Sequence, residues 1–190
     1  MSIPNTLEEA IEFLFEHPDD AEWRPKRETI SLDYVNSWMQ SSDIELLGFA
    51  HYILKDKRFS VEPALAVEEY VKFSKHYFGR CFRENPDGEW SHSNYSAGAS
   101  LCLMFVHLWD DQDVPRSILA ELRSWIRELY VKGNSELRLC LVHATLEHFE
   151  RKPIMDFFLE WRNDPVLNAA FEEAALWGIY GGKTPLSGAE

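Results

Sequence analysis

The sequence predicts an all-α protein, and three observations support that fold class. Apolar residues recur at helical spacing along most of the chain. Capping residues precede most of these runs, and no segment keeps the period-two alternation of a half-buried strand. The chain has 190 residues, enough for one core. We therefore expect about nine helices in antiparallel hairpins, forming one domain over 1–182 with a loose tail over 183–190.

Capping signals divide the first half of the chain into four expected helices. Thr6 and Glu9 form a capping box, and the helix that follows should stop at the His17-Pro18 pair. The second helix should run from Ser31 to about Met39, and the third, opened by Ser42-Asp43-Ile44-Glu45, should reach about Leu54. The fourth should be capped by Ser60, have Pro63 in its first turn, and reach about Phe82. Asn85-Pro86-Asp87-Gly88 reads as a turn.

Five more helices are expected in the second half. The segment 94–109 is apolar nearly all round, which is typical of a central helix buried on several sides. The segment opened by Asp113-Val114-Pro115 has the clearest amphipathic pattern and should end at Lys132-Gly133. The other expected spans are 134–149, 153–161 and 165–180, the last capped by Asp164 and stopped by Gly181-Gly182.

Three helix junctions share a pattern of an aromatic residue, a short polar turn, a capping residue and a leucine. The caps are Asp43, Asn134 and Asp164. This pattern resembles the HEAT and armadillo class of α-helical repeats over about half of the chain. The resemblance implies a curved stack of helix pairs that binds a protein partner on its concave face. A compact irregular bundle is the alternative.

Composition and charge exclude several functional classes. The net charge is −13, and a field of that sign repels the phosphates of nucleic acids. Three widely spaced cysteines, Cys81, Cys102 and Cys140, argue against a disulfide framework or a cysteine-rich zinc site. The N-terminus lacks a signal-peptide pattern, and the longest apolar stretch, 101–109, is too short to span a bilayer. We therefore expect a cytoplasmic protein that binds neither nucleic acid nor membranes.

The strongest candidate site is a polar stripe on the expected helix 134–149. Glu136, Cys140, His143 and Glu147 are spaced at i, i+4, i+7 and i+11, which places them on one face. Such a set can contact a partner, bind a metal ion, or pair a cysteine nucleophile with a histidine base. We add His107 as a further candidate, near the acidic Asp110–Asp113 loop. No residue is assigned to catalysis, to a cofactor or to a metal.

Weaker motifs receive structural interpretations. Gly181-Gly182-Lys183-Thr184 imitates the end of a phosphate-binding loop, but it follows a helix and reads as a helix end. Ser91-His92-Ser93 has no visible acid partner and reads as the approach to a helix. His51 is expected to be an ordinary core or surface histidine.

The favoured function is a non-enzymatic module that captures a basic protein. Bacterial immunity proteins are an analogy at the level of fold and charge. One alternative is a DNA mimic that inhibits a nucleic-acid-binding protein. The other is an enzyme or metal-binding protein that uses the Glu136–Cys140–His143–Glu147 stripe.

Overall fold

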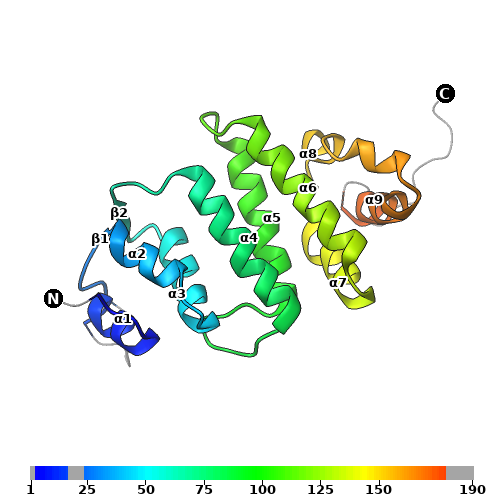
Figure 1. Cartoon of the computed structure of the whole chain (residues 1–190). Helices are drawn as coiled ribbons and strands as arrows, with labels where there is room; N and C mark the ends of the chain where they lie inside the picture. The colour runs from blue at the N-terminus through cyan, green and yellow to red at the C-terminus, as the bar shows by residue number, and fades with distance from the viewer. Residues whose placement is uncertain (1–2, 17–23, 179–190) are drawn as a thin grey trace. The chain divides into compact units, whose positions relative to one another are not determined.

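The protein is helical throughout, as a computed structural model that describes residues 3–16 and 24–178 shows (Figure 1). These ranges contain nine α-helices, one π-helical turn, one 3-10 turn and a pair of three-residue strands, which confirms the all-α prediction. The chain divides into two compact units, Met1–Ser93 and Asn94–Glu190, and each is described by itself. That residues 1–182 form one domain and resemble helical repeats stays a prediction. Within the described ranges, no helix combines the length and apolarity needed to cross a membrane.

The first unit contains four helices and two short strands. In chain order they are α1 (Leu7–Leu14), β1 (Thr29–Ser31), α2 (Leu32–Met39), α3 (Ile44–Lys55), β2 (Ser60–Glu62) and α4 (Val67–Glu84). The predicted helices at 31–39 and 43–54 are confirmed to within one residue. The predicted turn after α4 is also present, and Asn85 ends that helix in the left-handed region at φ 43°.

Side-chain caps fix the starts of α1 and α3. At α1 the Thr6 hydroxyl accepts from the Glu9 amide at 3.2 Å and the Glu9 carboxylate accepts from the Thr6 amide at 3.3 Å, as the capping box predicts. At α3 the cap is Asp43, as the junction pattern predicts, and its carboxylate accepts from the Glu45 amide at 2.9 Å. The Glu45 side chain bonds instead to the loop that follows α4.

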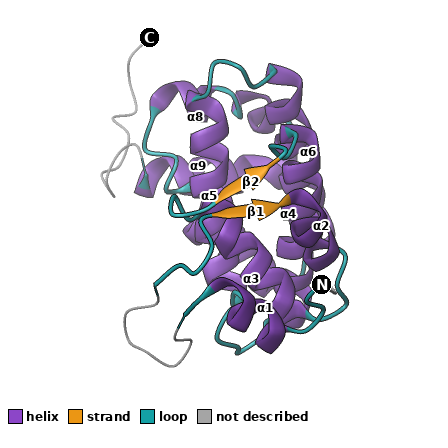
Figure 2. Cartoon of the chain, turned by 90° about the vertical axis from the view of Figure 1, so that its left-hand side faces the viewer, coloured by secondary structure: helices purple, strands orange, loops and turns teal. Residues whose placement is uncertain are grey.

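The Ser60 cap is the main error in the predicted elements. Ser60 begins β2, which pairs in parallel with β1 so that Thr29 lies opposite Ser60 and Ser31 opposite Glu62 (Figure 2). The helix α4 starts only at Val67, after Ala66. A strand of three residues is too short to show a period-two pattern. The sequence therefore contained no strand signal to weigh against the helix signal at Ser60.

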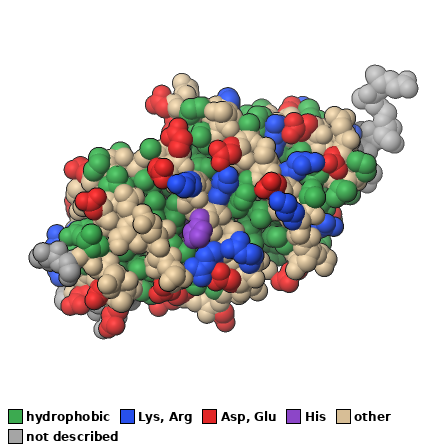
Figure 3. All heavy atoms as spheres, in the orientation of Figure 1, with side chains coloured by type: hydrophobic (Ala, Val, Ile, Leu, Met, Phe, Trp, Pro, Cys, Tyr) green, Lys and Arg blue, Asp and Glu red, His purple; other side chains and the backbone are tan. Residues whose placement is uncertain are grey.

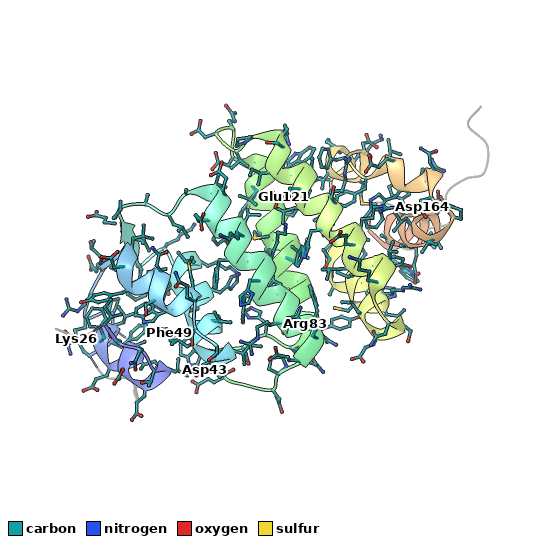
Figure 4. All side chains as sticks on the ribbon, viewed as in Figure 1. Lys26, Asp43, Phe49, Arg83, Glu121 and Asp164 are labelled. Carbon is teal, nitrogen blue, oxygen red and sulfur yellow. The ribbon has the colours of Figure 1, made fainter. Side chains whose placement is uncertain are left out.

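Aromatic side chains build the core of the first unit around Phe49 of α3, labelled in Figure 4. Its ring lies 5.8 Å from Trp38, 4.9 Å from Trp90 and 6.5 Å from Phe15, measured between centroids. The adjacent Gly48 allows the 85–93 loop to approach, since a Cβ there would lie 2.2 Å from the Trp90 carbonyl oxygen.

The Glu45 carboxylate holds the same loop by accepting from the amides of Trp90 and Ser91, each at 3.0 Å. Burial alone would raise the pKa of Glu45, but the bonds from the loop amides outweigh it and lower the pKa. The absence of a side chain at Gly48 lets the loop pack closely on α3, and the Glu45 hydrogen bonds hold it there.

The second unit contains the remaining helical elements. They are α5 (Asn94–Asp110), α6 (Arg116–Lys132), α7 (Ser135–Cys140), the π-helical turn η1 (Leu141–Leu146), α8 (Lys152–Asp156), the 3-10 turn η2 (Leu159–Asn163) and α9 (Pro165–Trp177). Asn134 and Asp164 cap α7 and α9, as predicted. The single helices expected at 134–149 and 153–161 are each replaced by a helix and a different kind of turn. The expected stop at 181–182, Gly181-Gly182-Lys183-Thr184 and the tail over 183–190 lie outside the described residues.

Packing in the second unit centres on α5 and η1. The rings of Phe105, Phe149 and Phe158 form a cluster with centroid separations of 5.0 to 5.5 Å. On α5, Gly98 faces η1 so closely that a Cβ would lie 2.8 Å from that of Ala144, and the Thr145 hydroxyl donates to the Gly98 carbonyl at 3.0 Å.

The prediction that α5 is buried on several sides is only partly correct. Tyr95 and Leu103 are 53% and 52% exposed. A helix that is apolar all round can therefore leave one apolar face uncovered within the described structure, which the sequence did not indicate.

Candidate functional site

The first half of the predicted stripe is anchored to the start of α5. The Asn94 side-chain amide donates to Glu136 at 2.9 Å, and the Cys140 thiol donates to the Asn94 carbonyl at 3.1 Å. Glu136 lies in the exposed first turn of α7, whereas Cys140, one turn later, is covered and only 1% exposed. Burial, with a smaller contribution from the Glu136 charge, raises the pKa of Cys140 to about 11. A thiol held protonated in this way is a poor nucleophile.

The second half of the stripe lies on and after η1, where the backbone widens. The Glu147 amide donates to the Val142 carbonyl five residues earlier, at 2.9 Å. Above this turn, His143 Nδ1 lies 2.9 Å from a Glu147 carboxylate oxygen, and His143 Nε2 lies 3.2 Å from a Glu173 oxygen of α9. His148 Nε2 is 3.7 Å from the other Glu147 oxygen. The structure thus adds Glu173 and His148 to His143 and Glu147.

His143 is placed to connect α9 with η1 and is not arranged as a catalytic base. His143 Nδ1 is hydrogen-bonded to Glu147, and Nε2 lies within ion-pair distance of Glu173. A general base needs one ring nitrogen directed at a substrate, and here both face carboxylates. Among the residues that the structure describes, no group of three or more histidine, cysteine or acidic side chains is placed to hold a metal ion.

The remaining candidate, His107, is not part of this cluster. It is exposed in the last turn of α5, where its carbonyl accepts from the Asp111 amide at 3.1 Å. In the adjoining loop, the Asp111 carboxylate accepts from the Asp113 amide at 2.9 Å. Asp111 therefore satisfies a backbone donor within the loop, while α6 begins after Pro115 without a side-chain cap, so these acidic residues do not cap the next helix.

A second polar cluster, in the first unit, was missed by sequence reasoning. His51, Tyr77 and His92 come together from α3, α4 and the loop before α5, with the two imidazole centroids 5.3 Å apart. The Tyr77 hydroxyl lies 2.6 Å from His92 Nδ1 and accepts from the His92 amide at 3.0 Å. His51 is 1% exposed, and its Nε2 has no hydrogen-bond partner within the described residues.

Burial keeps both of these imidazoles neutral near pH 7. Burial, aided by the positive charges of His92 and Lys55, holds the pKa of His51 well below its usual value. Burial, with Lys55 nearby, lowers the pKa of His92 to about 4. The Tyr77 hydroxyl lies near two acceptors, His92 Nδ1 and the Trp90 carbonyl at 3.3 Å. Protonation of His92 places a hydrogen on Nδ1, which leaves the Trp90 carbonyl as the acceptor for the hydroxyl. Because the two histidines are 41 positions apart in the sequence, no local spacing signal predicts this cluster.

The surface carries a surplus of carboxylates because many cations are already paired. At least nine lysines or arginines of the described residues form ion pairs with acids: Arg58, Lys72, Arg80, Arg123, Arg127, Lys132, Arg151, Lys152 and Arg162. On and just after α1, the exposed Glu8, Glu12 and Glu16 form no ion pair within residues 3–16 and 24–178. Figure 3 shows acidic and basic side chains interspersed over the visible face.

Comparison with known proteins identifies no relative. No family model matches the chain, and neither the curated proteins nor the solved structures give a significant match.

Proposed function

We propose that this chain is a non-enzymatic protein-binding module that captures a basic protein partner in the cytoplasm. The observation that carries the proposal is the surplus of exposed carboxylates. The net charge is −13, while at least nine of the 19 lysines and arginines are already neutralised by ion pairs within the fold. The unpaired carboxylates of this surface therefore favour an oppositely charged partner and speed its association.

The state of the nucleophilic side chains supports binding over catalysis. The three cysteines are free and buried, and burial raises the pKa of each to between about 11 and about 12. Both ring nitrogens of His143 face carboxylates. Free thiols in a chain without a disulfide also suit a reducing compartment.

The distribution of charge favours a protein partner over DNA mimicry. A DNA mimic needs carboxylates spaced like phosphates with few cations among them, whereas basic side chains interrupt the acidic ones on the face in Figure 3. A basic protein can match such a mixed surface by placing its own carboxylates against the exposed cations.

The test is affinity capture from a lysate of the native host on the immobilised full chain, at low and at high salt, read by mass spectrometry. We expect one stoichiometric basic protein that salt releases, because exposed charge pairs are screened over about 10 Å at 0.1 M. Capture of an acidic protein, of a protein that salt does not release, or of none would refute the proposal. A control chain with Glu8, Glu12 and Glu16 changed to glutamine shows how much of the capture depends on the α1 carboxylates.

A further inference from the structure

An open cavity of about 450 Å³ lies beside α5 in the second unit. Its walls are mainly apolar side chains from α5, from the residues that follow η1 and from α8, and His148, Glu150 and Arg151 also line it. The apolar residues are Ala99, Cys102, Leu103, Val106, Phe149 and Ile154. This volume falls within the roughly 300–1,000 Å³ typical of binding pockets, so the cavity is large enough to hold a bound apolar group.

The apolar surface continues from the cavity along α5. Tyr95, Ala99, Leu103 and Val106 follow one another at spacings of four, four and three residues, which places them on one side of the helix. We call these residues the α5 stripe. From Tyr95 to Leu103 it extends about 12 Å at 1.5 Å per residue. A small molecule in the cavity would leave Tyr95 uncovered, whereas an amphipathic helix laid along the stripe would cover it all.

The charge beside the cavity is acidic, because its cations are already paired. Arg151 lies 2.7 Å from Asp110, and Lys152 lies 2.7 Å from Asp156. Glu150 is exposed, lines the cavity, and takes part in no ion pair among the residues described. A cationic side chain beside an apolar anchor is therefore the complement of this rim.

The Glu150 carboxylate also acts electrostatically on the cavity wall. Burial raises the pKa of the Cys102 thiol to about 12, and the Glu150 charge adds to that effect. A Coulombic effect on a wall residue indicates that the carboxylate lies near the apolar surface, where the dielectric constant is lower than in water.

We infer that the α5 stripe and its cavity bind an amphipathic, basic helix of a partner protein. An apolar side chain of that helix fills the cavity, and a neighbouring lysine or arginine pairs with Glu150. This inference rests on the proposed function and gives the captured partner a location and a chemical pattern.

The test is binding of a synthetic amphipathic helical peptide of leucine and lysine to the full chain, followed by fluorescence anisotropy. Leu103→Ala should weaken binding roughly tenfold, as expected for a central interface anchor. Glu150→Gln should weaken it about threefold at low salt and not at high salt. The matched controls are Leu159→Ala, which truncates a leucine 44% exposed on η2, and Glu68→Gln, which removes an exposed charge from α4. Both controls should bind like the unmodified chain.

The outcomes separate this site from the proposed function. Salt-sensitive peptide binding that Leu103→Ala and Glu150→Gln leave unchanged would overturn the site while the capture of a basic partner stands. No peptide binding would also overturn the site, and failure of lysate capture would overturn the proposed function as well. Uptake of the neutral dye Nile red that depends on Leu103, without peptide binding, would assign the cavity to small molecules. A dimer in sedimentation that Leu103→Ala dissociates would assign the stripe to a second copy.

Discussion

The buried histidine pair in the first unit predicts that acid weakens the fold before its carboxylates titrate. His92 has a pKa of about 4 in the folded chain, below the ordinary histidine value of 6.5, so the unfolded chain binds more protons between these values. A group whose neutral form is favoured by folding stabilises the protein above pH 6.5, and that contribution is lost as the pH falls toward 4. His51 is shifted in the same direction.

The magnitude for His92 follows from linkage. Between pH 7 and pH 5 this shift corresponds to a loss of about 2 kcal/mol in the free energy of unfolding. The ring is only partly buried, so solvent screening reduces the expected value to about 1–2 kcal/mol. Asp56, whose pKa is lowered to about 2 chiefly by its bond from Arg58, stays ionised over this range and contributes no slope.

The assay is urea unfolding of the full chain by circular dichroism at pH 7 and pH 5. His92→Asn keeps an acceptor near the Tyr77 hydroxyl without a titrating ring, so it should lose about 1–2 kcal/mol less than the unmodified chain between the two pH values. The control is His76→Asn, which changes an exposed histidine on α4 and should leave the pH dependence as it was. Equal losses in His92→Asn and in the unmodified chain would refute the reasoning.

Three further substitutions test the packing, each by thermal and urea unfolding. Trp38→Phe removes the buried donor to the Pro4 carbonyl, at 2.9 Å, and should cost about 1–3 kcal/mol; no loss would mean that this bond contributes nothing. Gly98→Val should cost about 1–3 kcal/mol because the added atoms meet Ala144 and Thr145, and unchanged stability would show that α5 and η1 pack less closely. Leu122→Ala, at a fully buried position of α6, should cost about 2–5 kcal/mol, and an unchanged stability would contradict the assigned helix face.

Local signals predicted the helix starts well because capping is a contact between near neighbours in the chain. Asn134 bonds an amide three residues later, and Asp164 bonds amides two and three residues later, so their spacing is readable in the sequence. Ser60 carried the same kind of signal, but pairing with β1 about thirty residues earlier overrode it. A three-residue parallel pairing is a tertiary contact that local propensity does not encode.

In the candidate site too, contacts between sequence neighbours were predictable and contacts made by tertiary packing were not. The pair His143–Glu147 is separated by four residues on one helical segment and was readable as neighbours. Its partner Glu173 lies thirty residues further on, and its position depends on how α9 packs against η1. The π-helical turn at 141–146 also escaped prediction, because the sequence around His143 has the ordinary spacing of an α-helix.

The contact between α3 and the 85–93 loop gives this fold a signature that can outlast overall sequence similarity. Gly48 tolerates no larger side chain without displacing the loop, and Glu45 supplies the acceptor for two loop amides. Selection that preserves this loop would retain an acidic residue and a glycine three positions apart on one helix, and an aromatic residue some forty positions later. Residues on the exposed faces would be free to change. A distant relative can therefore be sought by this spaced triplet, Glu45, Gly48 and Trp90, in chains whose remaining positions have diverged.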